Sequence, residues 1–272
     1  MKPVEVIEGA GPVVLAMPHG GGHIPAAIEA RLNETGRARA DTDWHIDRLY
    51  DGLLPGATIV RALFHRYVID ANRAPDDADL YPGQNGTGLC PLTDFDGRPI
   101  YGPGPTPDRR ETDERRRDWH DPYHRALARQ LERLRRRYGA VVLYDCHSIR
   151  STLPYLFDGR LPDFNIGTDD GRSCAAPLQA AAAKICARAT GYTLAVNGRF
   201  RGGWTTRHYG RPEAGVHAIQ MELAQAAYMD ERPPWRFDEA RAAALRVYLA
   251  DILTTIEHMA LSGALQGQEA EP

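Results

Sequence analysis

Apolar residues in this chain are concentrated in short runs, most of them too brief to be helices. Runs that are rich in β-branched and aromatic side chains predict buried strands. They cover residues 13–17, 57–63, 66–70, 140–146, 193–196 and 216–223. Several of these runs show no polar alternation, which is typical of strands that are covered on both faces of a sheet.

Longer segments between these runs carry apolar residues at helical spacing. They predict helices over residues 111–138, 172–190 and 237–261, and a loosely helical stretch over 24–39 that starts at Pro25. Gly139 and Gly191 are suitable stops for the first two helices. Because helices alternate with strands, the pattern predicts one α/β domain.

Residues 74–110 interrupt this pattern with many prolines and glycines. A connection of this length without periodicity is either functional or disordered. Phe95, Ile100 and Tyr101 argue against disorder, because large apolar side chains need a surface on which to pack. We therefore expect an ordered loop that forms a wall or lid of the functional site.

Composition restricts the class of protein. The 272 residues suit a single domain over 1–272, with an expected frayed tail at about 264–272. Hydrophobic content of 43% and charged content of 25% are typical of globular proteins, and a net charge of -3 gives no reason to expect nucleic acid or an anionic membrane as a partner. The four cysteines are scattered, as expected for reduced thiols. We expect a cytoplasmic protein without a signal peptide or membrane span. The oligomeric state is left open.

Reactive side chains follow or close three of the predicted strands. His19 follows the strand at 13–17, His147 follows the strand at 140–146, and Glu222 lies near the end of the strand at 216–223. Open α/β sheets bind ligands at the carboxyl ends of their strands. A single histidine after a strand is more often structural, but two in the same setting favour a shared site.

Two histidines and a carboxylate are a typical ligand set for catalytic zinc. We interpret His19, Asp43 and His147 as the ligands, with Asp41 and Asp47 as alternatives to Asp43. Zinc bound in this way lowers the pKa of a water molecule to about 7 and polarises a carbonyl group. The sequence therefore predicts one divalent metal ion, which we expect to be Zn²⁺.

His23 stands four residues after His19, a spacing that on a helix would place both rings on one face. The glycines at 20–22 between them disfavour a helix. We therefore expect His23, and also Asp47, to line the site without holding the metal.

Glu222 is the candidate acid–base residue. A carboxylate near the end of so apolar a strand must be either paired or functional. A base beside the metal could take a proton from water and pass it to the leaving nitrogen. The alternative interpretation is a salt bridge between Glu222 and an arginine.

Cationic and amide side chains suggest an anionic substrate. Asn72 and Arg73 close the apolar run that precedes them, where the arginine could bind a carboxylate through two parallel hydrogen bonds. The glycine-rich segment 197–210 adds further candidates for substrate binding, namely Arg199, Arg201, Arg207 and His208. It lacks the Gly-Lys-Ser/Thr ending of a phosphate loop.

Taken together, these motifs resemble the N-formylglutamate amidohydrolase family. The resemblance rests on the segments 17–21, 41–50, 67–73, 143–148, 202–210 and 220–223, which occur in the family's order between about residues 10 and 260. The chain departs from the family pattern after His19, where His-Ser-Gly or His-Ala-Gly is more usual and a second histidine like His23 is not expected.

The resemblance implies a three-layer α/β/α fold with a mixed central sheet, like that of zinc carboxypeptidases and aspartoacylases. It implies hydrolysis of N-formyl-L-glutamate to L-glutamate and formate, in histidine degradation. This sequence departs from the zinc carboxypeptidases because its candidate carboxylate ligand, Asp43, lies far from His19 along the chain. Two alternatives are a deacylase for another N-acylamino acid or short peptide, and a binding protein of the same fold that has lost catalysis.

Overall fold

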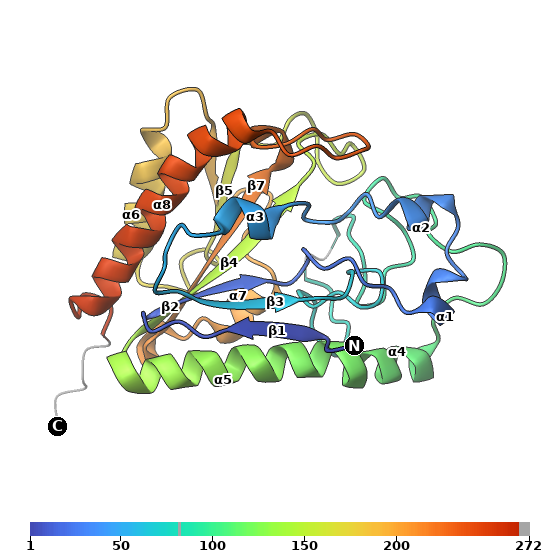
Figure 1. Cartoon of the computed structure of the whole chain (residues 1–272), viewed down its shortest axis with the longest axis horizontal. Coiled ribbons are helices and arrows are strands. Elements are labelled where there is room, and N and C mark those ends of the chain that lie inside the picture. The colour runs from blue at the N-terminus through green and yellow to red at the C-terminus, as the bar shows by residue number, and fades with distance from the viewer. Residues whose placement is uncertain (81–82, 267–272) are drawn as a thin grey trace.

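The computed structural model describes residues 1–80 and 83–266 (Figure 1). Its centre is a seven-stranded sheet in the order β1-β3-β2-β4-β7-β5-β6. The strands are β1 (Val4–Ile7), β2 (Val13–Met17), β3 (Thr58–Ala62), β4 (Val141–Ile149), β5 (Phe164–Gly167), β6 (Leu194–Val196) and β7 (Val216–Ala224). The part of the predicted frayed tail beyond residue 266 lies outside the described residues.

The four central strands are parallel and the margins of the sheet are not. β3, β2, β4 and β7 run in the same direction, whereas β1 is antiparallel to β3, and β5 is antiparallel to β7. The sheet is therefore mixed, as predicted. The carboxyl ends of the four central strands meet at one edge, where α/β folds bind their ligands.

Helices cover both faces of the sheet, so the fold has three layers (Figure 1). One face carries the long helix α5 (Asp121–Tyr138), preceded by α4 (Arg109–Arg115), and the short helix α7 (Trp204–Tyr209). The opposite face carries α3 (Ile46–Tyr50), α6 (Ala176–Ala187) and α8 (Glu239–Leu261). The two short helices α1 (Ala26–Glu29) and α2 (Glu34–Ala38) lie beyond the sheet edge. The predicted α/β/α fold is confirmed. Within the described residues, no helix is long and apolar enough to span a bilayer.

Alternation of side chains along β4 and β7 explains where the site forms. On the α8 side, both strands contribute mainly apolar side chains to the larger core. On the α5 side, both strands begin with apolar residues and then become polar, at Asp145 and His147 on β4 and at Gln220 and Glu222 on β7. All four polar residues are buried. Because buried polar groups require partners, this end of the sheet must hold a connected polar network.

Two sequence predictions need correction. Residues 66–70 are not a strand: Val68 N donates to His65 O in a turn, and Asp70 N donates to Leu89 O of the long loop. The apolar run indicated burial, which it shares with a strand, since its apolar side chains pack in the core beneath α5. The predicted helix over 111–138 begins at Arg109, ends before Gly139 and is interrupted by a π-helical turn, Arg116–His120.

Candidate active site

A cavity opens at the carboxyl ends of the central strands, and its lining comes from segments far apart in the chain. The turn after β2 contributes His19, and β4 and β7 contribute His147 and Glu222. The long loop contributes Leu80, residues 84–87 and Phe95. This part of the loop lies where a wall of the site was expected.

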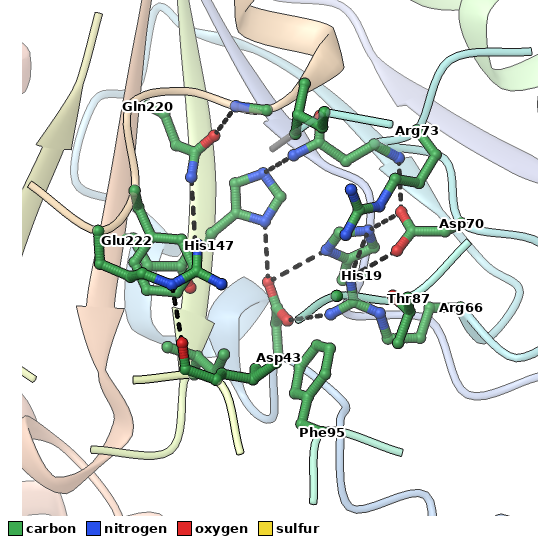
Figure 2. Close-up of a pocket in the computed structure, with 18 of the residues that line it drawn as sticks. His19, Asp43, Arg66, Asp70, Arg73, Thr87, Phe95, His147, Gln220 and Glu222 are labelled. Carbon is green, nitrogen blue, oxygen red and sulfur yellow. Dashed lines mark hydrogen bonds and ion pairs between the residues drawn. The ribbon is translucent and has the colours of Figure 1, made fainter. Parts of the chain in front are cut away.

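The Asp43 carboxylate lies at the centre of the buried end of this cavity. Its Oδ2 atom is 3.2 Å from His147 Nδ1 and 3.8 Å from His19 Nδ1. Ser148 N donates to the same oxygen at 3.1 Å. Figure 2 shows both imidazole rings turned toward this carboxylate. His19, Asp43 and His147 each offer one ligand atom within 4.8 Å of the other two, and all three residues are buried.

Each histidine has a second carboxylate close to its Nε2 atom. His19 Nε2 is 2.7 Å from Asp70 Oδ1, and His147 Nε2 is 3.1 Å from Asp145 Oδ1. A carboxylate behind a ligating histidine favours the proton on the nitrogen that faces it, which leaves the lone pair of the other nitrogen for a metal. In both histidines, that other nitrogen is the Nδ1 atom that faces Asp43.

The charges of this cluster fit a divalent cation. Asp43, Asp70 and Asp145 are buried together, and Arg66 neutralises part of their charge through a 2.7 Å contact between its Nη2 and Asp70 Oδ2. Burial opposes ionisation of Asp70, but Arg66 and then His19 outweigh it and hold its pKa well below the usual value. Buried charges are stable only when they are compensated, and two imidazoles with one carboxylate form a typical zinc ligand set.

The pKa values of His19 and His147 are shifted in opposite directions by this environment. Burial, reinforced by the neighbouring Arg66 charge, lowers the pKa of His19. Burial also opposes charge on His147, but the Asp145 and Asp43 carboxylates outweigh it and hold its pKa well above the usual value.

Asp41 and Asp47 lie outside the cluster of possible ligands. Asp41 Oδ2 accepts hydrogen bonds from Tyr67 OH at 2.8 Å and from Phe95 N at 2.9 Å, so it anchors the wall that carries Phe95. Burial raises the pKa of Asp41 to about 6. Asp47 is exposed and pairs with Arg61 at 3.2 Å. The geometry thus favours Asp43 among the three carboxylates considered.

Glu222 lies beside His147, its register partner across β4 and β7. Gln220 Nε2 donates to Glu222 Oε2 at 3.1 Å, and Gln220 Oε1 accepts from Gly203 N at 2.6 Å. The Gly203 contact fixes the orientation of the Gln220 amide, so that its NH₂ group faces Glu222. Among the described residues, no arginine or lysine lies within ion-pair distance of Glu222. Burial raises the pKa of this carboxyl to about 8.

Arg73 and Asn72 lie at the cavity on the segment that follows Asp70. Asn72 Oδ1 accepts from Thr205 N at 2.8 Å, which turns Asn72 Nδ2 toward His147 Nε2 at 3.1 Å. The Arg73 guanidinium lines the cavity, and no group in residues 1–80 or 83–266 accepts a hydrogen bond from it. A planar cation with five donors in this position suits a substrate carboxylate.

Three predicted substrate-binding residues lie outside the cavity. Arg201 Nη1 is 3.5 Å from Asp170 Oδ2, and Arg207 Nε is 3.4 Å from Asp169 Oδ1. His208 stacks on Trp204, with ring centroids 4.3 Å apart. All three side chains are absent from the lining of the cavity. The same segment instead contributes Arg199 and Phe200 to the cavity lining.

His23 and Asp47, which were expected to line the site, lie outside the cavity. Both residues border a separate depression on the other side of the glycines at 20–22. His23 N donates to Leu63 O at 3.1 Å, which ties it to the end of β3, and its ring packs against Trp119.

Sequence reasoning missed several groups that complete the site, namely Arg66, Asp70, Asp145, Gln220 and Thr87. Asp145 and Gln220 carry a detectable signal, since each stands two residues before a chosen site residue and shares its face of a strand. Arg66 and Asp70 were not identified as site residues because the segment 66–70 was predicted to be a strand. Thr87 lies in a loop without periodicity.

Comparison with known proteins gives consistent matches. A family model described as N-formylglutamate amidohydrolase matches residues 11–229. The N-formylglutamate deformylase of Pseudomonas aeruginosa is 47% identical over 249 residues, covering 91% of this chain and 93% of that protein. The N-formylglutamate deformylase of Pseudomonas putida is 45% identical over 250 residues, covering 92% and 93%. The crystal structure of N-formylglutamate amidohydrolase from Ralstonia eutropha JMP134 has a TM-score of 0.80 and 29% identity, covering 97% of this chain and 100% of that chain.

The ligand geometry makes a prediction about stability. Zn²⁺ added to metal-free protein, at about a hundredfold excess over its dissociation constant, should raise the midpoint of thermal unfolding by roughly 5–10 °C, because it binds the folded state. His147→Ala should lose most of this shift. His258→Ala, at an exposed position on α8, is the matched control and should keep it. An equal shift in both variants would place the zinc elsewhere.

Proposed function

The chain belongs to the N-formylglutamate amidohydrolase family, and we propose that it hydrolyses N-formyl-L-glutamate to L-glutamate and formate with one bound divalent metal ion. The observation that carries this proposal is the convergence of the His19, Asp43 and His147 cluster with Glu222 and Arg73 on one cavity. The names of the relatives support the substrate. We further propose zinc as the metal and histidine degradation in the cytoplasm as the setting, following the resemblance.

His19, Asp43 and His147 would hold the metal, and Asp70 and Asp145 would keep the two imidazoles oriented. When bound there, zinc supplies Lewis-acid polarisation of the formyl carbonyl and a lowered pKa for water. The hydrogen bond from Ser148 N to Asp43 supports this assignment, because it fixes the carboxylate before any ion arrives. A preorganised site avoids the cost of ordering its ligands during binding.

Glu222 would act as general base and then as general acid. Its carboxylate takes a proton from the attacking water and delivers it to the amide nitrogen, so that the C–N bond breaks and glutamate leaves with a neutral amine. Gln220 restricts the carboxylate to one orientation. The buried environment, which raises the pKa of Glu222, supports both roles because the group can be protonated and deprotonated within one turnover.

Arg73 and Arg199 would bind the two carboxylates of the substrate. Both side chains line the cavity, and Arg73 presents its guanidinium without a protein acceptor among the described residues. The Asn72 side-chain amide, held by Thr205 N, lies beside His147 at the cavity and can donate an N–H to the substrate. Arg201, Arg207 and His208 have no place in this proposal, because they lie outside the cavity.

Glu222→Gln tests the proposed base. The variant should fold and bind zinc like the wild type but lower kcat by about 10²–10⁴-fold, since an amide cannot accept the proton. Steady-state formate release measures this loss. Glu132→Gln, which changes a carboxylate on the outer surface of α5, should keep wild-type turnover. Near-wild-type turnover by Glu222→Gln would exclude Glu222 as the base.

Arg73→Lys tests the carboxylate clamp. Lysine keeps the charge but loses the planar pair of donors, so kcat/KM for N-formyl-L-glutamate should fall by about 10–100-fold, mainly through KM. Arg201→Lys is the matched control and should leave both constants unchanged, because Arg201 faces Asp170 outside the cavity. The opposite ranking of the two variants would return the clamp to the 201–207 segment.

A further inference from the structure

The segment from Asp70 to Arg73 supplies three side chains to the site although it is neither helix nor strand. Asp70 supports His19, Asn72 contacts His147, and Arg73 lines the cavity. A strand would hold its backbone through a ladder of hydrogen bonds, but this segment has no ladder. Its buried carbonyl groups must find other donors, because an unpaired buried carbonyl is costly.

Three successive carbonyls of this segment accept hydrogen bonds from the helices on the α5 face. His124 Nε2 contacts Ala71 O at 2.8 Å, and His120 Nε2 contacts Arg73 O at 3.0 Å. Between them, Trp204 N donates to Asn72 O at 3.4 Å. Histidine side chains therefore hold the backbone on both sides of Asn72, and neither histidine lines the cavity.

The π-helical turn Arg116–His120 leads directly into α5 and sets the direction of both histidines. His120 and His124 are one turn apart, with ring centroids separated by 4.3 Å. A π-helical turn inserts an extra residue and shifts the phase between the helix before it and the helix after it, and such turns are frequent at functional sites. Arg115, the last residue of α4 before the π-helical turn, donates from Nη1 to Val68 O at 2.9 Å. Residues before the turn and residues after it therefore support the same irregular part of the chain.

The hydrogen-bond roles of these histidines are consistent with fixed donors. His124 Nε2 lies 2.8 Å from Ala71 O, and because a carbonyl oxygen can only accept, this nitrogen carries the ring proton. Tyr209 OH fixes the other side of the residue, 3.1 Å from His124 Nδ1 and 3.2 Å from His124 O, to which it donates. Burial lowers the pKa of both His120 and His124. Both rings also pack against Trp204, whose backbone completes the set of three donors.

We propose that His120 and His124 are positioning residues: they hold the backbone at 71–73 so that Arg73 and Asn72 meet the substrate in a fixed geometry. Neither residue lines the cavity, so both act through the segment that they support. The inference rests on the proposed function, since the geometry matters for the binding of an N-formyl amino acid. It assigns a role to two buried histidines that the metal site and the acid–base step leave unused.

The first experiment compares His120→Phe with His120→Gln. Phenylalanine keeps the ring but removes the donor, so KM for N-formyl-L-glutamate should rise by about tenfold while zinc content stays unchanged. Glutamine can donate from a similar position and should recover most of the loss. His258→Phe, at an exposed position, is the control for the histidine-to-phenylalanine change and should keep wild-type constants. Equal constants for His120→Phe and the wild type would overturn the inference.

A double-mutant cycle separates positioning from general stability. If His120 acts through Arg73, the effect of His120→Phe should shrink in the Arg73→Lys background, because the clamp is already impaired. Effects that multiply independently would overturn the inference. Should His120→Phe fail to fold, Tyr209→Phe removes only the hydroxyl that contacts both Nδ1 and the backbone O of His124, and it should give a smaller rise in KM, of about two- to threefold. An unchanged KM in that variant would count against the proposal.

Hydrogen exchange gives a readout that does not depend on turnover. Backbone amides of 70–73 should exchange faster in His120→Phe than in His120→Gln or the wild type. If the wild type releases no formate but this difference is present, the proposed function fails and the positioning role stands. Unchanged exchange at 70–73 would overturn the positioning role even if the wild type is an active deformylase.

Discussion

Burial of the Asp43 carboxylate is the constraint around which the rest of the site is arranged. An ionised carboxylate removed from water is stable only with close partners. Asp43 accepts a hydrogen bond from Ser148 N and lies 3.2 Å from His147 Nδ1, and His19 Nδ1 is 3.8 Å away. Each of these partners comes from, or directly follows, a central strand. The parallel strands thus bring their carboxyl ends together around a charge delivered by the loop between α2 and α3 (Figure 2).

Some residues of the site lie on regular strands, and others lie on irregular backbone. His147 and Glu222 lie within paired strands, so the sheet itself fixes the distance between a proposed metal ligand and the proposed base. Arg73 and Asn72 lie on a segment without such pairing, and the histidines of the π-helical turn and α5 supply the missing backbone partners. Groups that must keep a fixed geometry need support of this kind wherever the backbone is irregular.

Much of the fold was predictable from local pattern. The apolar runs identified β2, β3, β4 and β7, and the reactive residues near their ends pointed to the correct edge of the sheet. The choice among Asp41, Asp43 and Asp47 could not be made from sequence, because all three lie close together and their directions depend on tertiary contacts. The geometry of Asp43 depends on His147, which is 104 positions away.

The errors have equally specific causes. Residues 66–70 are as apolar as a strand because they are buried, yet Asp70 pairs with the long loop. Arg201 and Arg207 meet Asp170 and Asp169 instead of the cavity, through tertiary contacts that the local sequence does not indicate. The supporting roles of Asp70 and His120 come from long-range contacts that have no periodic signal. Asp145 and Gln220 are different, because strand alternation alone places them beside His147 and Glu222.

Release of formate from N-formyl-L-glutamate tests the central claim most directly. Purified protein would be assayed as isolated, after chelation with metal loss verified, and after return of Zn²⁺, with glutamate quantified in the same samples. We predict equal amounts of formate and glutamate, loss of both after chelation and recovery of both with zinc. Undiminished release from protein verified to be free of metal would contradict the assignment of His19, Asp43 and His147 as a catalytic metal site.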